Sequence, residues 1–191
     1  MAELLQPVEA RLTAIVCEAR GADGSLGTAA QDAAISNTPA PVFRPAADGG
    51  DLRDPAYPPE QFDRAVFYEW LGSAPHPGTN NPRQPRLLER YDLRILVGYV
   101  YGADAATFVA TTGGESASTQ VRVVRRRALS DARRLKVALE EPALTGGGTD
   151  PVVTAVRIER ATVEDLRGGR LLLVLQTSVL VESTRPGTYA P

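Results

Sequence analysis

The side chains most able to do chemistry in this sequence are basic residues gathered between positions 122 and 136. Seven basic residues fall in that stretch against a single acidic one, Asp131. Arginine dominates the group, and its planar guanidinium binds carboxylates and phosphates through several N–H donors at once. The predicted interface or channel residues are Arg122, Arg125, Arg126, Arg127, Arg133 and Arg134.

Three interpretations of this arginine cluster stay open at the level of sequence. The arginines are the exposed face of a helix paired with acidic residues of the same chain, or they form salt bridges between subunits of an oligomer, or they contact nucleic-acid phosphates. No aromatic residues are interleaved among them, as a single-strand-binding platform would require. A net charge of −2 also argues against nonspecific nucleic-acid binding by the whole surface.

Other residues that often carry chemistry are isolated. His76 is the only histidine and Cys17 the only cysteine, so a two-histidine metal site and an intrachain disulfide are excluded. The acidic residues Asp48, Asp51 and Asp54 lack the oxygen spacing and final glutamate of an EF-hand. Neither a phosphate-binding P-loop nor a dinucleotide-binding glycine motif nor a G-x-S-x-G elbow is present. The sequence therefore predicts no cofactor, no metal site and no enzymatic activity.

The length of 191 residues and a hydrophobic fraction of 43% are typical of one globular domain, which we expect to span residues 1–191. The longest apolar runs, such as 171–175, fall far short of the roughly 20 residues that cross a bilayer. Glu3 and Glu9 lie where a signal peptide would need basic and apolar residues. We therefore expect a protein with no membrane partner.

Two segments have the three- and four-residue apolar spacing of amphipathic helices. The first covers 2–20. The second covers 118–141, and Pro142 stops it. Ser130 and Asp131 favour helix caps, so a kink is predicted there. The apolar stripe of the second helix consists of Val121, Val124, Ala128, Ala132, Leu135 and Leu139.

Four segments have the composition or alternation of strands. They are residues 65–71, 90–101, 152–164 and 170–182. Gly168 and Gly169 lie in the turn of the closing hairpin. The predicted fold is α+β: an antiparallel-biased sheet of two hairpins with both helices packed on one face. Long loops are expected at 21–61, apart from a short strand at 41–44, and at 72–85. We expect the first loop to be functional, ordered by a partner or locally disordered.

In this order of elements the chain resembles the tail terminator (tail completion, neck) proteins of tailed bacteriophages and gene transfer agents. The resemblance covers most of residues 1–20 and 62–183. It rests on the segments DLRILVGYVYG, SDARRLKVALEEP and VVTAVRIERATVEDLRGGRLLLVLQTSVLVES. The loops at 21–61 and 72–85 depart from the family pattern.

The resemblance implies a non-enzymatic virion protein that is assembled in the host cytoplasm. It implies a homo-oligomeric ring, typically a hexamer, that caps the tail tube, joins it to the head-completion or connector protein, and leaves a lumen for genome DNA. Two alternatives remain. One is another virion ring protein, such as a head-completion or tail-tube subunit, and the other is a small nucleic-acid-binding α+β domain that uses the arginine-rich helix.

Overall fold

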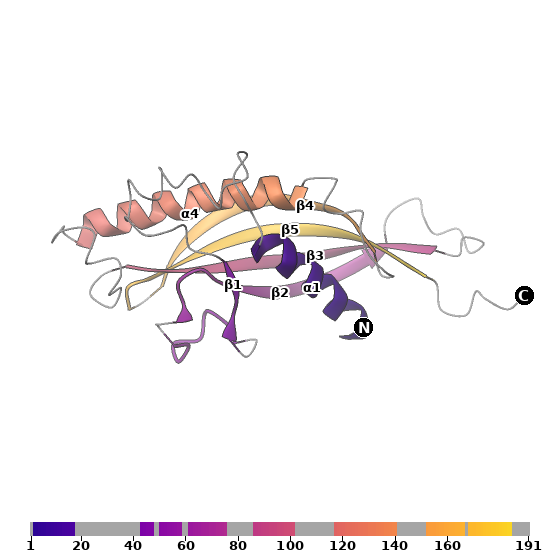
Figure 1. Ribbon diagram of the computed structural model, residues 1–191, viewed down its shortest axis with the longest axis horizontal. Helices are drawn as coiled ribbons and strands as arrows, with labels where there is room; N and C mark the ends of the chain where they lie inside the picture. Colours follow the sequence, from indigo (N-terminus) through magenta and orange to yellow (C-terminus); the bar gives the residue numbers. More distant parts are fainter. Residues whose placement is uncertain are drawn as a thin grey trace, which may run out of the picture.

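A five-stranded sheet runs the length of the molecule (Figure 1). The computed structural model describes residues 2–17, 43–47, 50–58, 61–75, 86–101, 117–140, 152–166 and 168–184. The strands are β1 (Arg44–Pro45), β2 (Ala65–Pro75), β3 (Arg86–Val100), β4 (Val152–Leu166) and β5 (Arg170–Thr184). Their order in the sheet is β1-β2-β3-β5-β4, and every neighbouring pair is antiparallel except the parallel pair β1 and β2. The predicted α+β class and antiparallel bias are confirmed.

The centre of the sheet is formed by β3 and β5, which pair along their whole lengths. Odd-numbered residues of both strands share one face, because Ile95 lies opposite Leu175 and Tyr99 opposite Leu171. The even-numbered Leu172 is buried as well. The first half of β5 is therefore covered on both sides, as expected of a strand whose apolar run does not alternate.

Both helices, α1 (Ala2–Cys17) and α4 (Ala117–Glu140), pack on the face that carries the odd-numbered residues of β3. From α1, Glu9 accepts a hydrogen bond from the indole N–H of Trp70 on β2, and Thr13 bonds the Tyr68 hydroxyl. Helix α4 lies over β4 and β5 and also contacts α1 (Figure 1). The prediction of two helices on one face is confirmed. Neither helix, within the described residues, is long and apolar enough to cross a membrane.

The opposite face is covered at one end by residues 50–58, which we call the strap. Leu52 and Tyr57 of the strap are buried, and so is Phe62, which follows it. The guanidinium of Arg170 lies over the Phe62 ring at 5.0 Å. A Cβ on Gly98 would lie 2.3 Å from the Phe62 carbonyl oxygen, so only glycine permits this close approach.

The structure corrects part of the prediction of a long loop at 21–61. Residues 43–47 and 50–58 pack onto the chain's own core through Phe43, Ala46, Leu52 and Tyr57, so for these residues the prediction of a structureless loop is wrong. The short strand expected at 41–44 is β1, at Arg44–Pro45. This stretch is anchored by single apolar side chains that do not recur at the spacing of a helix or a strand. Patterns of apolar residues therefore could not predict its packing. Residues 18–42 lie outside the described residues.

Several element boundaries also differ from prediction. Strand β2 continues to Pro75 and β3 already begins at Arg86, so the loop predicted at 72–85 is wrong for residues 72–75. These ends pair with each other, as Ser73 with Tyr91, and the pairing extends both strands. The rest of that loop, including His76, lies outside the described residues. Helix α4 runs unbroken through Asp131, so the predicted kink is also wrong.

The Gly98 contact yields a stability prediction. Replacing Gly98 with alanine should lower the free energy of unfolding by about 1–3 kcal/mol, because the methyl group would push the Phe62 backbone off the sheet. Urea denaturation followed by Trp70 fluorescence measures the change. Gly72→Ala is the matched control, since a Cβ there meets nothing within 4 Å. Equal effects of the two substitutions would contradict a tight contact at Gly98.

Candidate functional site

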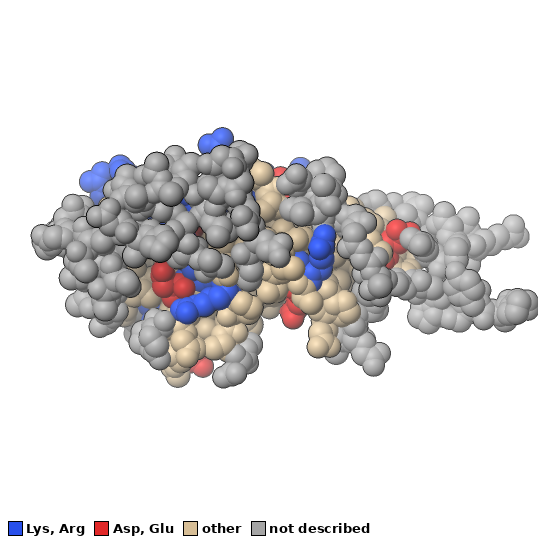
Figure 2. All heavy atoms as spheres, viewed as in Figure 1, with Lys and Arg blue, Asp and Glu red and all other residues tan. Residues whose placement is uncertain are grey.

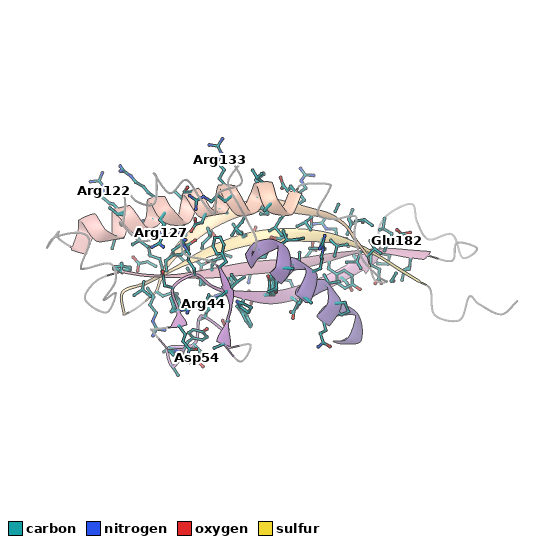
Figure 3. All side chains as sticks on the ribbon, viewed as in Figure 1. Arg44, Asp54, Arg122, Arg127, Arg133 and Glu182 are labelled. Carbon is teal, nitrogen blue, oxygen red and sulfur yellow. The ribbon has the colours of Figure 1, made fainter. Side chains whose placement is uncertain are left out.

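The six arginines predicted from sequence all lie on α4, but the structure divides them into two groups. Helix α4 buries the side that carries Val124, Ala128, Leu135 and Leu139 against the sheet and α1. At 3.6 residues per turn, arginines at different positions of the helix must then point to different sides. Figure 3 shows this division: Arg122 and Arg133 point away from the sheet, and Arg127 points toward it.

Three of these arginines are held by carboxylates of the same chain. Arg127 is buried and lies 3.9 Å from Asp63, and Arg134 lies 3.3 Å from Asp131. Arg125 is exposed and reaches Asp165 on β4 at 3.6 Å. These three arginines therefore pair with carboxylates of the same chain, but only Arg125 does so from an exposed side of the helix.

Beneath α4 lies a fully buried polar cluster that the sequence did not predict. Arg64 and Asp131 are each 1% exposed and form an ion pair of 3.0 Å. The Tyr99 hydroxyl donates a hydrogen bond of 2.8 Å to the same carboxylate oxygen. Arg64 also has a left-handed backbone with φ of 55°, which is uncommon for a residue other than glycine. The cluster joins the residue before β2, the end of β3 and the middle of α4.

Burial governs the ionisation of this cluster. Desolvation raises the pKa of the Asp131 carboxyl, while Arg64, Tyr99, Arg127 and Arg134 all act to lower it. Desolvation also raises the pKa of Tyr99 well above its ordinary value, so the phenol stays protonated and serves as a donor. Because Arg64 and Asp131 are shielded from solvent, we assign the cluster to holding α4 on the sheet.

The remaining three arginines share the outward side of α4 with two apolar residues. Positions 122, 126, 129, 133 and 137 fall within about 80° of arc on a helix of 3.6 residues per turn. We call this surface the outer face of α4, and it consists of Arg122, Arg126, Leu129, Arg133 and Val137. Leu129 is 54% exposed and Val137 is 57% exposed. Basic side chains project at the same edge of the molecule in the space-filling view (Figure 2).

The outer face has no counter-charge within the part of the chain that the structure describes. None of Arg122, Arg126 and Arg133 has a carboxylate within 4.0 Å there, in contrast to the other three arginines of the helix. Among the described residues only Leu71, Leu129 and Val137 are large apolar side chains that are more than half exposed, and two of these lie on this face. Leu129 and Val137 were not predicted from the sequence. The signal that could have found them is the presence of two apolar residues on the same side of the helix as three arginines.

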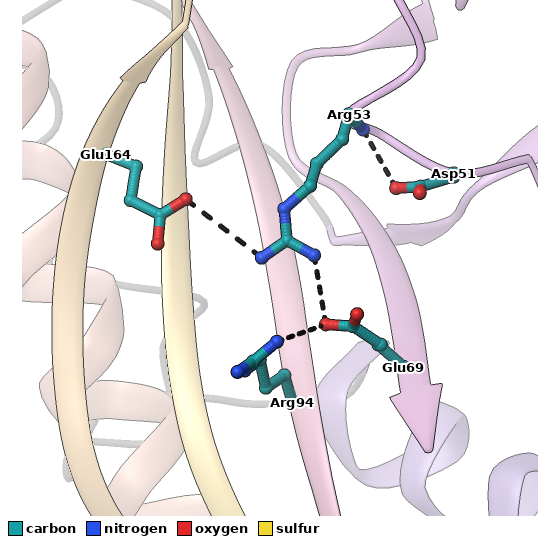
Figure 4. Close-up of polar contacts among 5 residues, drawn as sticks. All are labelled: Asp51, Arg53, Glu69, Arg94 and Glu164. Atoms are coloured by element: carbon teal, nitrogen blue, oxygen red, sulfur yellow. Dashed lines mark hydrogen bonds and ion pairs between the residues drawn. The ribbon is translucent and has the colours of Figure 1, made fainter. Parts of the chain in front are cut away.

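A second charged group crosses the opposite face of the sheet (Figure 4). Arg53 of the strap lies 2.9 Å from Glu69 on β2 and 4.0 Å from Glu164 on β4, and Arg94 on β3 also reaches Glu69, at 3.1 Å. The hydrogen bond from Arg53 lowers the pKa of Glu69 below its ordinary value. These ion pairs fasten the strap across the sheet. No group of three or more histidine, cysteine, aspartate or glutamate side chains suited to a metal occurs in the described residues.

Comparison with models of known protein families and with curated proteins gives no match for this chain. The outer face of α4 combines guanidinium groups that have no carboxylate partner among the described residues with exposed apolar side chains on the same helix.

The buried cluster gives a second stability prediction. Asp131→Asn should reduce the free energy of unfolding by about 3–5 kcal/mol, because the Arg64 charge would be left buried without a counter-ion. Guanidinium denaturation measures the loss. Asp165→Asn is the control: that carboxylate is 45% exposed and its pair with Arg125 should contribute less than about 1 kcal/mol. A loss at Asp131 as small as that at Asp165 would show that the buried pair does not anchor α4.

The strap gives a prediction on pH dependence. Because the folded-state pKa of Glu69 lies below its ordinary value of 4.5, its contribution to stability is present above pH 4.5 and is lost as pH falls through the folded-state pKa. Glu69→Gln should therefore lower stability near pH 7 by about 1 kcal/mol or less. Urea titrations at a series of pH values should show the difference from wild type vanishing in acid. If the difference in stability persists in acid, it comes from the packing of the Glu69 side chain and not from its ion pairs.

Proposed function

We propose that this chain is a structural, non-enzymatic subunit that assembles with copies of itself into a ring through the outer face of α4. We further propose that the ring is a tail terminator, located in the virion at the junction of head and tail. In this role it caps the tail tube, joins it to the head-completion or connector protein, and surrounds the path of the genome DNA. The resemblance of residues 1–20 and 62–183 to that family supports the proposal, as does the α+β fold.

The observation that carries the assembly role is the composition of the outer face. The buried core of a protein interface is more apolar than the rest of the surface, arginine is enriched in interfaces, and it is among the residues that contribute most to binding. Leu129 and Val137 are exposed between and beside the unpaired arginines, where a purely solvated helix face would carry polar residues. A phosphate-binding surface gains nothing from these two apolar side chains.

A rigid framework behind the surface also favours protein–protein contact. On the inner side of α4, Asp131 forms a buried ion pair with Arg64, and the buried Arg127 reaches Asp63 at 3.9 Å. The outer face is thus fixed before any partner arrives, so little conformational freedom of the helix is lost on binding.

The assembly role makes a direct prediction. The double substitution Leu129→Asp and Val137→Asp should convert wild-type rings into monomers, because it places carboxylates in the apolar part of the contact. Mass photometry measures the assembly, and circular dichroism checks that the fold persists. Leu71→Asp is the matched control, since Leu71 is 52% exposed but lies on β2. Rings that survive the double substitution would exclude the outer face as the interface.

Two further measurements separate this proposal from its rivals. Tight binding of the isolated protein to short free duplex, weakening by roughly 0.9 log unit per log unit of salt for each phosphate contact, would indicate a nucleic-acid-binding domain instead. Cryo-electron microscopy of particles containing the chain should show one ring between connector and tube. Stacked copies along the tail would identify a tube subunit, and copies confined to the capsid shell would overturn the proposal.

A further inference from the structure

The strap carries a charge opposite to that of the outer face of α4, and the two lie on opposite sides of the sheet. Asp51 and Asp54 of the strap are exposed. Figure 3 shows Asp54 at the edge of the molecule opposite Arg122 and Arg133. One molecule therefore presents an acidic surface on one side and a basic surface on the other.

The outward charge of the strap is acidic because its one basic residue points inward. The Arg53 guanidinium is engaged by Glu69 at 2.9 Å and by Glu164 at 4.0 Å on the sheet beneath (Figure 4). Asp51 and Asp54 are left as the outward charges, and the apolar Pro55 and Ala56 beside them are exposed.

The two strap carboxylates are held in fixed positions. Asp51 Oδ1 accepts the backbone N–H of Arg53 at 2.9 Å, and Asp54 Oδ1 accepts that of Ala56 at 2.8 Å. The buried side chains of Leu52 and Tyr57 anchor the strap on either side of Asp54. Binding by this surface would therefore cost little conformational entropy.

The spacing of the acidic pair matches that of neighbouring arginines on α4. The Asp54 N–H donates to the Asp51 carbonyl at 3.0 Å, the bond of a β-turn, which keeps their Cα atoms within about 7 Å. Arg122 and Arg126 are one helical turn apart, about 6 Å along the axis. Each of the two carboxylates can then pair with one guanidinium, and Leu129 lies beside these arginines on the outer face.

We propose that the strap of one copy docks on the outer face of α4 of the next copy, pairing Asp51 and Asp54 with Arg122 and Arg126. This inference rests on the proposed ring function and names the surface that its interface uses. Pro55 and Ala56 supply the apolar contact for Leu129. Because the two surfaces differ, the contact is heterologous, and repeated copies either close into a ring or extend without limit.

Charge reversal tests the pairing. A helix variant, Arg122→Glu with Arg126→Glu, and a strap variant, Asp51→Arg with Asp54→Arg, should each be at least tenfold weaker in self-association. Mixed in equal amounts, the two should assemble again in a 1:1 ratio, because every contact in an alternating ring then pairs opposite charges. Mass photometry and native mass spectrometry report the composition.

Two controls guard against loss of fold or a general charge effect. Asp51→Asn with Asp54→Asn keeps the side-chain oxygens that accept the backbone N–H groups, so it should weaken assembly at least tenfold while the melting temperature stays unchanged. Arg157→Glu with Arg160→Glu changes the net charge as the helix variant does, at exposed positions on β4, and should assemble like wild type.

The outcomes separate this inference from the proposed function. If the helix variant fails to assemble while the asparagine variant assembles normally and mixing restores nothing, the strap is not the partner surface, although α4 remains an interface. If the wild-type chain stays monomeric at every concentration, both proposals fail. Restored 1:1 assembly on mixing supports both.

Discussion

Helix α4 can lie on the sheet in one rotation only, because Asp131 has to meet Arg64 and Tyr99 in an interior where an unpaired charge would be strongly destabilising. That constraint decides which residues of the helix face inward and which face outward. With Asp131 fixed toward the sheet, Arg127 and Arg134 flank it on the inner side, and positions 122, 126, 129, 133 and 137 are turned outward. The outer face is thus a consequence of the buried pair.

The same cluster connects the two faces of the sheet. Arg64 follows Phe62 by two residues, and its backbone N–H donates to the carbonyl of Gly98, the residue against which Phe62 packs on the opposite face. A short segment between strap and β2 therefore contacts both layers. The strap is tied further by Arg53 to two separate strands. Displacement of either layer would disturb the other, which keeps the strap and α4 in a fixed relation across the sheet.

Elements whose apolar residues recur at a regular spacing were predictable from sequence. Those fixed by tertiary contacts were not. Alternation in β3 and β5 and the apolar stripe of α4 identified the sheet and the helix. Asp131 was interpreted as a cap because aspartate favours helix ends locally, yet here a buried partner distant in sequence overrides that preference. The strap has no period, since Leu52 and Tyr57 are single anchors. Helical spacing places Arg122, Arg126 and Arg133 on one side of α4, but only the fold shows that Arg127 and Arg134 are paired with Asp63 and Asp131.

The preference for arginine suits a surface of this kind. Lys136 is the only lysine among the 21 basic residues of the sequence, so the preference belongs to the whole chain and not to α4 alone. A guanidinium can pair with a carboxylate through two N–H groups while its flat face packs on apolar neighbours, so one residue type serves both the buried pairs and the outer face. In a head-to-tail contact, the two surfaces of each copy lie on opposite sides of one sheet. The fold would then determine the angle between successive copies. In such an assembly, the number of subunits that closes a ring would be set by how α4 and the strap are fixed relative to each other.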